Sequence, residues 1–235
     1  MNKIITGDNL DVMKMLQSNS VDTIITSPPY NKGYWSRNRN PNNGFRTKAR
    51  RIDYDNFDDK MNPDDYEKWI SKVIEECLRV LKPTGSLFFN HTDILREHQT
   101  HFPSFILEFP LKQIIIWNRK NTPKLDKSYF FPINEWVFWL QKTPTARTYF
   151  DRKKATHQKN IWEISPEKNN NHPAPFPLEL PLNIIQATTP EGGLVLDPFC
   201  GSGTTCLAAK QLGRNYLGID VSEVYCEEAR RRIDE

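Results

Sequence analysis

The stretch VLDPFCGSGTT, residues 195–205, joins a short apolar strand to a helix through a turn that contains two glycines. Glycine backbones can approach a ligand closely, and the helix that starts near Thr204 offers unpaired N–H groups. A second strand, 216–219, ends at Asp220, and an acidic residue about 20 residues beyond such a turn is placed to accept both hydroxyls of a ribose. We therefore expect residues 195–220 to bind a ligand at the carboxyl end of a parallel sheet.

Strands and helices alternate along the rest of the chain, which predicts an α/β fold with a doubly wound, mostly parallel sheet. We expect strands at 3–6, 21–26, 86–90, 114–117, 136–140, 194–196 and 216–219. We expect helices that start at Asp8, Asn62 and Ser222, that span 177–187 and 204–212, and one near 94–107. Ligands of such sheets bind beyond the carboxyl ends of the strands.

Composition and length fit a single domain, 1–235. Hydrophobic residues make up 37% and charged residues 26% of the 235 residues, a balance typical of a globular protein that can bury one core. The net charge of +3 says little about partners, so the distribution of charge matters more. The four cysteines have no zinc-site spacing, and no run approaches a membrane span, so we expect an intracellular protein without metal or membrane.

The motif Thr26-Ser27-Pro28-Pro29-Tyr30 follows a β-branched strand. Two prolines remove two backbone donors and fix φ, so regular structure must end there and a rigid loop begins. By itself the motif predicts no more than a stiff polyproline turn with a surface tyrosine. It gains meaning because it ends a strand of the same sheet as the glycine turn.

Several ligands suit the turn of residues 197–205. A P-loop would need lysine after Gly203, and a dinucleotide fingerprint would need glycine or alanine where Cys206 stands. The carboxylate of Asp197 would repel a pyrophosphate, whereas it suits the cationic amino group of S-adenosylmethionine. A strand–turn–helix without a ligand is the remaining alternative, against which Asp220 argues.

Together the two motifs resemble the DNA amino-methyltransferases, a resemblance that spans almost the whole chain. DPFCGSGTT resembles their S-adenosylmethionine motif, GID (218–220) their ribose-binding strand end, and HPAPFP (172–177) the segment that covers the methionine end. Asp8 matches a position near the adenine ring, although on residues alone it is only a helix cap. The implied cofactor-binding residues are Asp8, His172, Pro173, Ala174, Asp197, Pro198, Phe199, Cys200, Gly201, Ser202, Gly203, Thr204, Asp220 and Val221. The catalytic motif precedes the cofactor motif, which is the order of the β group.

The chemistry of that family explains the motif at 27–30. An exocyclic amine is a poor nucleophile because its lone pair is delocalised into the base, and acceptors on its N–H groups direct the lone pair out of plane. The resemblance implies that Ser27 and the Pro28 carbonyl are these acceptors, that Pro29 holds them rigid, and that Tyr30 stacks on a base extruded from the duplex. Transfer would be direct, with S-adenosylhomocysteine as product and no metal. Two further aromatic residues, Tyr129 and Phe131, are candidates to stack on the base.

Basic residues crowd two segments, 31–62 and 141–171. The first directly follows the catalytic loop, so we expect it to be a mobile loop that contacts DNA phosphates, with a solvated loop as the alternative. The second falls where the family places its target-recognition region, and it is short for that family. The candidate DNA-contacting residues are Lys32, Arg37, Arg39, Arg46, Lys48, Arg50, Arg51, Arg152, Lys153 and Lys154.

Ser27 bears on the target base. In the family, serine at this position usually accompanies N4-cytosine methylation and aspartate usually accompanies N6-adenine methylation, so we expect cytosine, with adenine as the alternative. A catalytically silent DNA-binding subunit is a further alternative, against which Asp197 and Asp220 argue. The resemblance implies double-stranded DNA as partner and the cytoplasm of a prokaryote, or a phage, as source. It leaves open a cognate restriction endonuclease and a homodimer.

Overall fold

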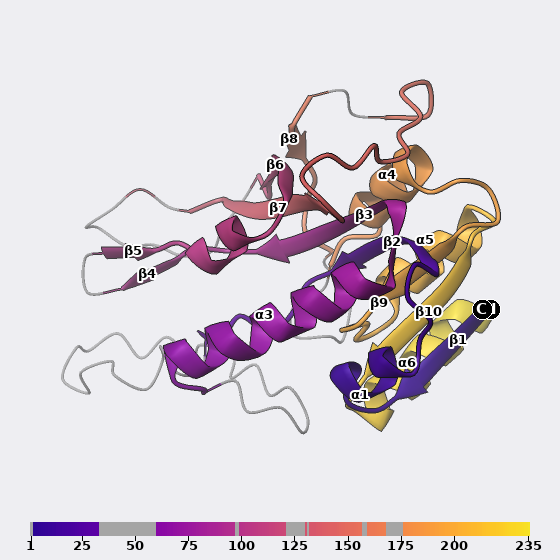
Figure 1. The fold of residues 1–235 in the computed structure, drawn as a ribbon, viewed down its shortest axis with the longest axis horizontal. Helices are drawn as coiled ribbons and strands as arrows, with labels where there is room; N and C mark the ends of the chain where they lie inside the picture. The colour runs from indigo at the N-terminus through magenta and orange to yellow at the C-terminus, as the bar shows by residue number, and fades with distance from the viewer. Residues whose placement is uncertain are drawn as a thin grey trace.

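The structure of the protein is a computed structural model. It describes residues 2–32, 60–96, 99–120, 130, 132–156, 159–167 and 176–235. An eight-stranded sheet runs through this part of the chain, in the order β1-β10-β9-β2-β3-β7-β6-β8 (Figure 1). The strands are β1 (Asn2–Thr6), β2 (Val21–Thr26), β3 (Leu81–His91), β6 (Leu111–Asn118), β7 (Asn134–Gln141), β8 (Ile161–Glu163), β9 (Leu194–Asp197) and β10 (Asn215–Asp220).

The sheet is mostly parallel, as the sequence predicts. Strands β1, β10, β9, β2 and β3 pair in parallel, whereas β7 runs antiparallel between β3 and β6. From β9 the chain passes to β10, on the side of β1, whereas from β2 it passes to β3, on the opposite side. The direction of winding therefore reverses between β9 and β2. The carboxyl ends of these two strands therefore meet at a topological switch point, where open α/β sheets bind ligands.

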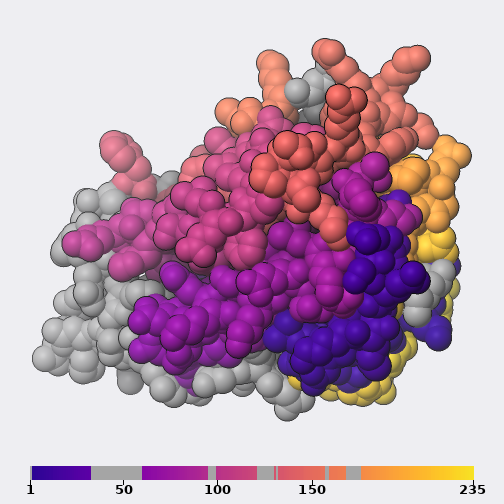
Figure 2. Space-filling view, in the orientation of Figure 1, coloured from indigo at the N-terminus to yellow at the C-terminus, as the bar shows by residue number. Residues whose placement is uncertain are grey.

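Helices cover both faces of the sheet. Helices α1 (Asn9–Lys14) and α3 (Pro63–Val80) pack on one face, and they form the near side of the molecule in Figure 2. Helices α4 (Glu179–Thr188) and α5 (Thr204–Gln211) pack on the other, where α6 (Glu223–Asp234) contacts α5. Alternate residues of one strand serve the two cores, since side chains of a strand point to opposite faces: Ile24 joins the first cluster and Ile25 the second.

Local signals set the starts of three helices as predicted. The Asp8 carboxylate accepts from the backbone N–H groups of Leu10 and Asp11, and Asn62 accepts from that of Asp64. Ser222 caps α6 by accepting from the N–H of Tyr225. In each case a short polar side chain satisfies an N–H group that has no partner within the helix.

The structure corrects the sequence-based expectation for residues 94–107. This segment forms a hairpin of β4 (Ile94–Arg96) and β5 (Gln99–His101), followed by the 3-10 helix η1 (Ser104–Glu108), in place of an α-helix. Pro103 lacks an N–H and its ring excludes a helical turn before it, so an α-helix cannot pass through this point. The 3-10 helix accordingly begins only after Pro103.

Two strands also differ from prediction. β3 begins at Leu81, well before the predicted start at Ser86, and includes Pro83 and Gly85. A shift in the pairing register between Val21 and Thr23 of β2 accommodates this irregular start. The short edge strand β8 has no counterpart in the prediction, because it arises in a polar segment and pairs only with β6.

Candidate active site

Two loops that lie far apart in sequence meet at the switch point. Thr26, the last residue of β2, donates a hydrogen bond of 2.8 Å from Oγ1 to Oδ1 of Asp197, the last residue of β9. Both residues are buried. Because Ser27 directly follows Thr26, this bond places the predicted catalytic motif beside the predicted cofactor turn.

The backbone of the turn between β9 and α5 depends on two glycines. Gly201 and Gly203 adopt φ angles of 48° and 79°, a left-handed region that L side chains rarely occupy. A Cβ atom on Gly203 would also lie 2.8 Å from Cβ of Ala229 in α6. The turn is closed by hydrogen bonds from the N–H of Gly203 to the Cys200 carbonyl and from the N–H of Cys200 to the Ile219 carbonyl.

Asp197 carries a charge that the protein only partly compensates. Burial raises the pKa of its carboxyl to about 6, against the hydrogen bonds from Thr205, Thr26 and the Phe199 N–H, which lower it. Within the described residues these partners are hydroxyls and one backbone N–H, and no lysine or arginine contributes. A buried carboxylate in this state fits a small cation such as an α-ammonium group.

Asp220 and Asp8 lie on neighbouring strand ends. One oxygen of Asp220 accepts from the N–H of Gly201 at 2.8 Å and the other from the N–H of Ser222 at 3.0 Å. The pairing of Thr6 with Asp220 and the bond from the Gly7 N–H to the Asp220 carbonyl bring Asp8 to the same edge. Val221, the next residue along, is 41% exposed. The structure thus gathers Asp8, Asp197, Asp220 and the glycine turn along one edge of the sheet.

Sequence reasoning missed an arginine of α6 that holds the turn by hydrogen bonds. Arg232 of α6 donates to the Thr204 hydroxyl at 2.8 Å and to the carbonyl and hydroxyl oxygens of Ser202, and it pairs with Glu167 at 3.2 Å. Arg232 belongs to a run of three arginines that has the pattern of a charged helix end, so nothing in its sequence context indicates this contact. The arginine fixes the start of α5 against α6.

The catalytic motif is held from below by α3 and β3. The Tyr66 hydroxyl donates to the Pro29 carbonyl at 2.8 Å and lies 3.1 Å from Nε2 of His91. His91 is buried, and burial lowers its pKa to about 4, so the imidazole is neutral at physiological pH. Its ring packs on that of Tyr30, with 4.7 Å between centroids.

The exposed fraction of Tyr30 is only 8%, because side chains already cover its ring. Besides His91, Nζ of Lys32 lies 4.6 Å from the ring centroid, within the range of a cation–π contact. An extruded base that stacks on the Lys32 side would have to replace this ammonium group. The stacking role of Tyr30 therefore stays a prediction.

A polar network behind the motif is the main feature that sequence reasoning did not find. Ser27 Oγ lies 2.7 Å from the Tyr30 hydroxyl, which in turn lies 3.3 Å from Oε2 of Glu135. The Asn90 amide donates to Glu135 Oε2 at 2.8 Å, to the Tyr30 hydroxyl at 2.5 Å and to Ser27 Oγ at 3.4 Å. Arg119 pairs with Glu135 Oε1 at 3.0 Å. A glutamate inside the apolar strand β7 is the sequence signal that marks this network.

The structure does not bring residues 152–154 to this edge. Arg152 and Lys153 are exposed, and Lys154 pairs with Glu191 at 2.9 Å, just beyond the carboxyl end of α4. The bond from the Asp151 N–H to the Ala187 carbonyl fixes the segment there, at the edge where the parallel strands start (Figure 1). Their contact with DNA stays a prediction.

Several predicted residues lie outside the described part of the chain. They are the cofactor candidates His172, Pro173 and Ala174, the aromatic candidates Tyr129 and Phe131, and the basic residues Arg37, Arg39, Arg46, Lys48, Arg50 and Arg51.

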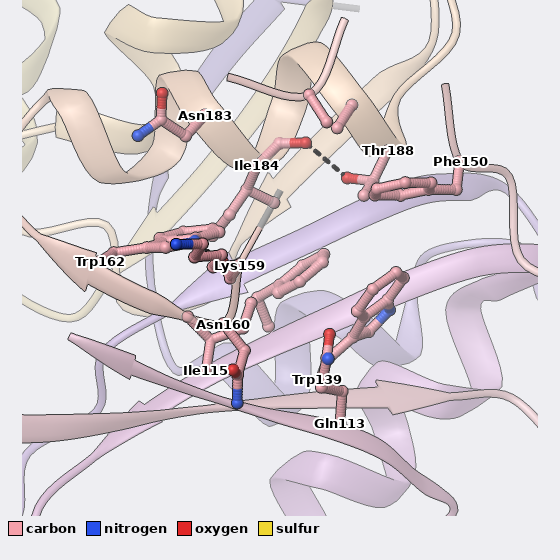
Figure 3. A pocket seen from close by; sticks show the side chains of 13 residues that line it. Gln113, Ile115, Trp139, Phe150, Lys159, Asn160, Trp162, Asn183, Ile184 and Thr188 are labelled. Atoms are coloured by element: carbon pink, nitrogen blue, oxygen red, sulfur yellow. Dashed lines mark hydrogen bonds between the residues drawn. The ribbon is translucent and has the colours of Figure 1, made fainter. Parts of the chain in front are cut away.

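A cavity of about 70 Å³ lies under α4, away from the switch point. Figure 3 shows Trp162 and Ile184 on one side of it, facing Ile115 and Trp139 on the other. Its lining contains none of the predicted catalytic or cofactor residues. The candidate active site is therefore the group of residues at the switch point rather than this cavity.

The described ranges contain neither a group of side chains suited to a metal ion nor a membrane-spanning helix. No group of three or more His, Cys, Asp and Glu side chains lies close enough together there to hold a metal ion. None of the helices in those ranges is long and apolar enough to cross a bilayer.

The arrangement matches a known family. A family model described as DNA methylase, for N6 and N4 methyltransferases, matches residues 21–231. The chain belongs to this family. The match includes both the catalytic motif and the cofactor turn, so this DNA methylase is a DNA amino-methyltransferase of the N4/N6 type. The resemblance inferred from the motifs is thereby confirmed.

Curated relatives cover nearly all of this DNA methylase. It is 31% identical to the type II methyltransferase M2.MboI of Moraxella bovis, over 99% of the chain and 87% of the relative. It is 28% identical to the DNA adenine methyltransferase YhdJ of Escherichia coli, over 98% of the chain and 82% of the relative.

Solved structures confirm the fold. The cytosine-N4-specific PvuII DNA methyltransferase superposes with a TM-score of 0.76 at 20% identity, over 99% of the chain and 86% of the other protein. The protein TTHA0409 of Thermus thermophilus, solved with S-adenosyl-L-methionine, gives a TM-score of 0.71 at 24% identity, over 99% of the chain and 93% of the other protein. The predicted doubly wound α/β fold is confirmed, and it is the Rossmann-like fold of these methyltransferases.

Proposed function

We propose that this DNA methylase transfers a methyl group from S-adenosylmethionine to the exocyclic amine of a base extruded from duplex DNA, with N4 of cytosine as the target. The observation that carries the proposal is the hydrogen bond between Thr26 and Asp197. It places a rigid acceptor loop and a partly compensated carboxylate on adjacent strand ends, where a donor and an amine can meet.

The residues at these strand ends fit S-adenosylmethionine. Asp197 offers its buried carboxylate to the α-ammonium group, the left-handed turn at Gly201 and Gly203 lets the backbone approach, and Asp220 lies where the ribose hydroxyls would be held. When bound, the cofactor supplies a methyl group whose bonding electrons to sulfur leave with the sulfur. One solved relative, the Thermus thermophilus protein, supports this choice, because it was solved as a complex with this cofactor.

The protein residues orient the amine. Ser27 Oγ and the Pro28 carbonyl accept from its N–H groups, and the bond from Tyr66 to the Pro29 carbonyl together with two fixed φ angles holds them in place. Preorganised acceptors of this kind need no rearrangement when the amine becomes cationic. The rigidity of residues 27–30 is therefore what the protein contributes to lowering the activation barrier of methyl transfer.

Ser27 supports cytosine, because serine in this motif usually accompanies N4-cytosine methylation. The second candidate is N6 of adenine, which the relative YhdJ, a DNA adenine methyltransferase, favours. The test is to incubate the protein with labelled S-adenosylmethionine and duplex DNA of mixed sequence, digest the DNA to nucleosides and identify the labelled one. Labelled N4-methylcytosine is the expected result. Labelled N6-methyladenine would transfer the proposal to adenine, and no label with any duplex would contradict both.

DNA contacts are proposed for Lys32 and the basic residues of segments 31–62 and 141–171. Each lysine or arginine that meets a phosphate contributes about one unit to the dependence of log affinity on log salt. Replacing Arg152 and Lys153 by alanine together should lower this slope by about two if both meet phosphates. An unchanged slope would remove the strand-start edge from the DNA interface.

A further inference from the structure

We propose that Glu135 is a positioning residue that terminates a proton path from the target amine through Ser27 and Tyr30. This inference rests on the proposed function, because it concerns the proton that the amine must lose as it is methylated. Neither the motif at 27–30 nor the cofactor turn contains a group that could finally hold this proton, since a serine hydroxyl is a very weak base.

The geometry supplies a continuous chain of hydrogen bonds. Ser27 Oγ lies 2.7 Å from the Tyr30 hydroxyl, and this hydroxyl donates to Glu135 Oε2 at 3.3 Å, so the three groups form one hydrogen-bonded chain. Tyr30 and Glu135 are 8% and 7% exposed, which leaves little room for bulk water beside them. The hydrogen-bonded chain is therefore the direct route away from Ser27.

Asn90 fixes the direction of the chain. Its amide nitrogen contacts Glu135 Oε2 at 2.8 Å, and the opposite amide orientation would set two oxygens against each other there. The same nitrogen donates to the Tyr30 hydroxyl at 2.5 Å. The Tyr30 hydroxyl donates to Oε2 of Glu135, so the single proton of Tyr30 points at Glu135 and Ser27 donates its own proton to Tyr30. The lone pairs of Ser27 are then left to receive an N–H of the amine.

The proton balance closes along this path. As the C–N bond forms, the nitrogen becomes cationic and carries one proton more than the product, so that removing this proton during bond formation lowers the barrier to transfer. That proton moves to Ser27 Oγ while the proton of Ser27 moves to Tyr30 and the proton of Tyr30 moves to Glu135 Oε2. The N–H bonding pair returns to nitrogen as its lone pair, both hydroxyls end neutral, and Glu135 ends as a carboxylic acid.

Arg119 separates the tasks of the two carboxylate oxygens. It pairs with Oε1 at 3.0 Å and also donates to the Pro132 carbonyl, so Oε2 faces Asn90 and Tyr30. The Arg119 side chain is 26% exposed and reaches from the network towards solvent. This exposed side is where Glu135 can release the proton before the next turnover.

The test compares Glu135→Gln and Tyr30→Phe with the wild-type protein in single-turnover methylation. Each variant keeps the shape of its side chain and removes one member of the path. We expect the rate to fall about 100-fold or more, the lower range for loss of acid–base assistance. In Glu135→Ala, where the shortened side chain leaves space beside the Tyr30 hydroxyl, the rate should rise with the concentration of a small buffer base such as formate, whereas the wild-type rate should not, because an external base must replace the lost acceptor. The affinity for S-adenosylhomocysteine, measured by calorimetry, should stay within threefold.

Two further variants guard against trivial outcomes. Glu75→Gln removes an exposed glutamate of α3 and should leave every readout unchanged. If Glu135→Gln unfolds because Arg119 loses its partner, the double variant Arg119→Gln/Glu135→Gln removes both charges and takes its place. A rate within threefold of wild type, or a slow rate of Glu135→Ala that formate does not raise, would overturn the proton path. Absence of methylation by the wild-type protein would instead contradict the proposed function.

Discussion

The two sides of the candidate active site are built in different ways. The cofactor side consists of consecutive residues, 197–205, whose glycine backbone and strand-end carboxylate are both local features. The catalytic side is assembled from side chains of separate segments, with Ser27, Asn90, Arg119 and Glu135 coming from or next to four different strands. A contiguous motif can be recognised in a sequence, whereas an assembled network becomes visible only when the strands are placed side by side.

The largest expected effect breaks the cofactor side alone. Asp197→Ala removes the carboxylate that we propose for the α-ammonium group, and the loss of a buried charge contact of about 3 kcal/mol corresponds to a roughly 100-fold rise in the Kd for S-adenosylmethionine. Tyr30→Ala is the matched variant of the catalytic side. It should leave this Kd within threefold and slow transfer. Calorimetry measures the Kd of both variants, and single-turnover methylation measures transfer. An equal loss of cofactor binding in the two variants would contradict the division of roles.

The next effect concerns the backbone of the turn. Gly203→Ala would force a Cβ to 2.8 Å from Ala229 at a φ of 79°, so we expect it to lower the free energy of unfolding by about 2–4 kcal/mol. Gly213→Ala is the control, because Gly213 has a φ of 69° but nothing within 4 Å of an added Cβ. It should cost only the conformational part, about 1–2 kcal/mol. Denaturant unfolding measures the difference, and equal costs would show that the contact with α6 does not matter.

A smaller effect is an expected increase, rather than a decrease, in the free energy of unfolding. Burial raises the pKa of Asp197 from 3.8 to about 6, so between these pH values the folded protein binds more protons than the unfolded chain, and its stability falls as the pH rises. Asp197→Asn removes this ionisation. Without cofactor it should raise the free energy of unfolding at pH 8 by about 1–3 kcal/mol, with the advantage gone below pH 4. Unfolding curves at the two pH values test this, and a variant less stable than wild type at pH 8 would contradict it.

The smallest effect sharpens the link between the two sides. Thr26→Val keeps the shape of the buried side chain but removes the bond to Asp197, so we expect a loss of about 1 kcal/mol in stability. Because the Thr26 bond lowers the Asp197 pKa, its removal should raise that pKa further. Thr100→Val, on the exposed strand β5, should change neither quantity. Unfolding curves and the pH dependence of cofactor affinity provide the measurements.

Much of the fold follows from local signals in the sequence. The caps at Asp8, Asn62 and Ser222 and the strand β2 agree with prediction because each depends on a few neighbouring residues. The segment 94–107 was predicted wrongly, because its apolar residues also suit a hairpin and a 3-10 helix around Pro103. The early start of β3 depends on pairing with β2, which a local pattern does not contain.

In the candidate site, too, the residues of local motifs were predicted and the residues with contacts distant in sequence were missed. Ser27, Tyr30, Asp197 and Asp220 belong to motifs with fixed spacing, and the structure gathers them at one edge. Arg232 was missed because its contacts join α6 to a turn 28–30 residues away. Glu135 and Asn90 lie 45 residues apart, and only the antiparallel pairing of β7 with β3 brings their strands together.

The boundary between β2 and β9 has a consequence for how the two ligands influence each other. The two strands share only two register pairs, Thr23 with Val195 and Ile24 with Leu196, and side-chain bonds such as that of Thr26 to Asp197 continue the connection. A cofactor cation that pairs with Asp197 therefore changes the hydrogen bond of Thr26, the residue that precedes Ser27. Binding free energies are reciprocal, so whatever factor the cofactor adds to the affinity for the extruded base, the base must add to the affinity for the cofactor.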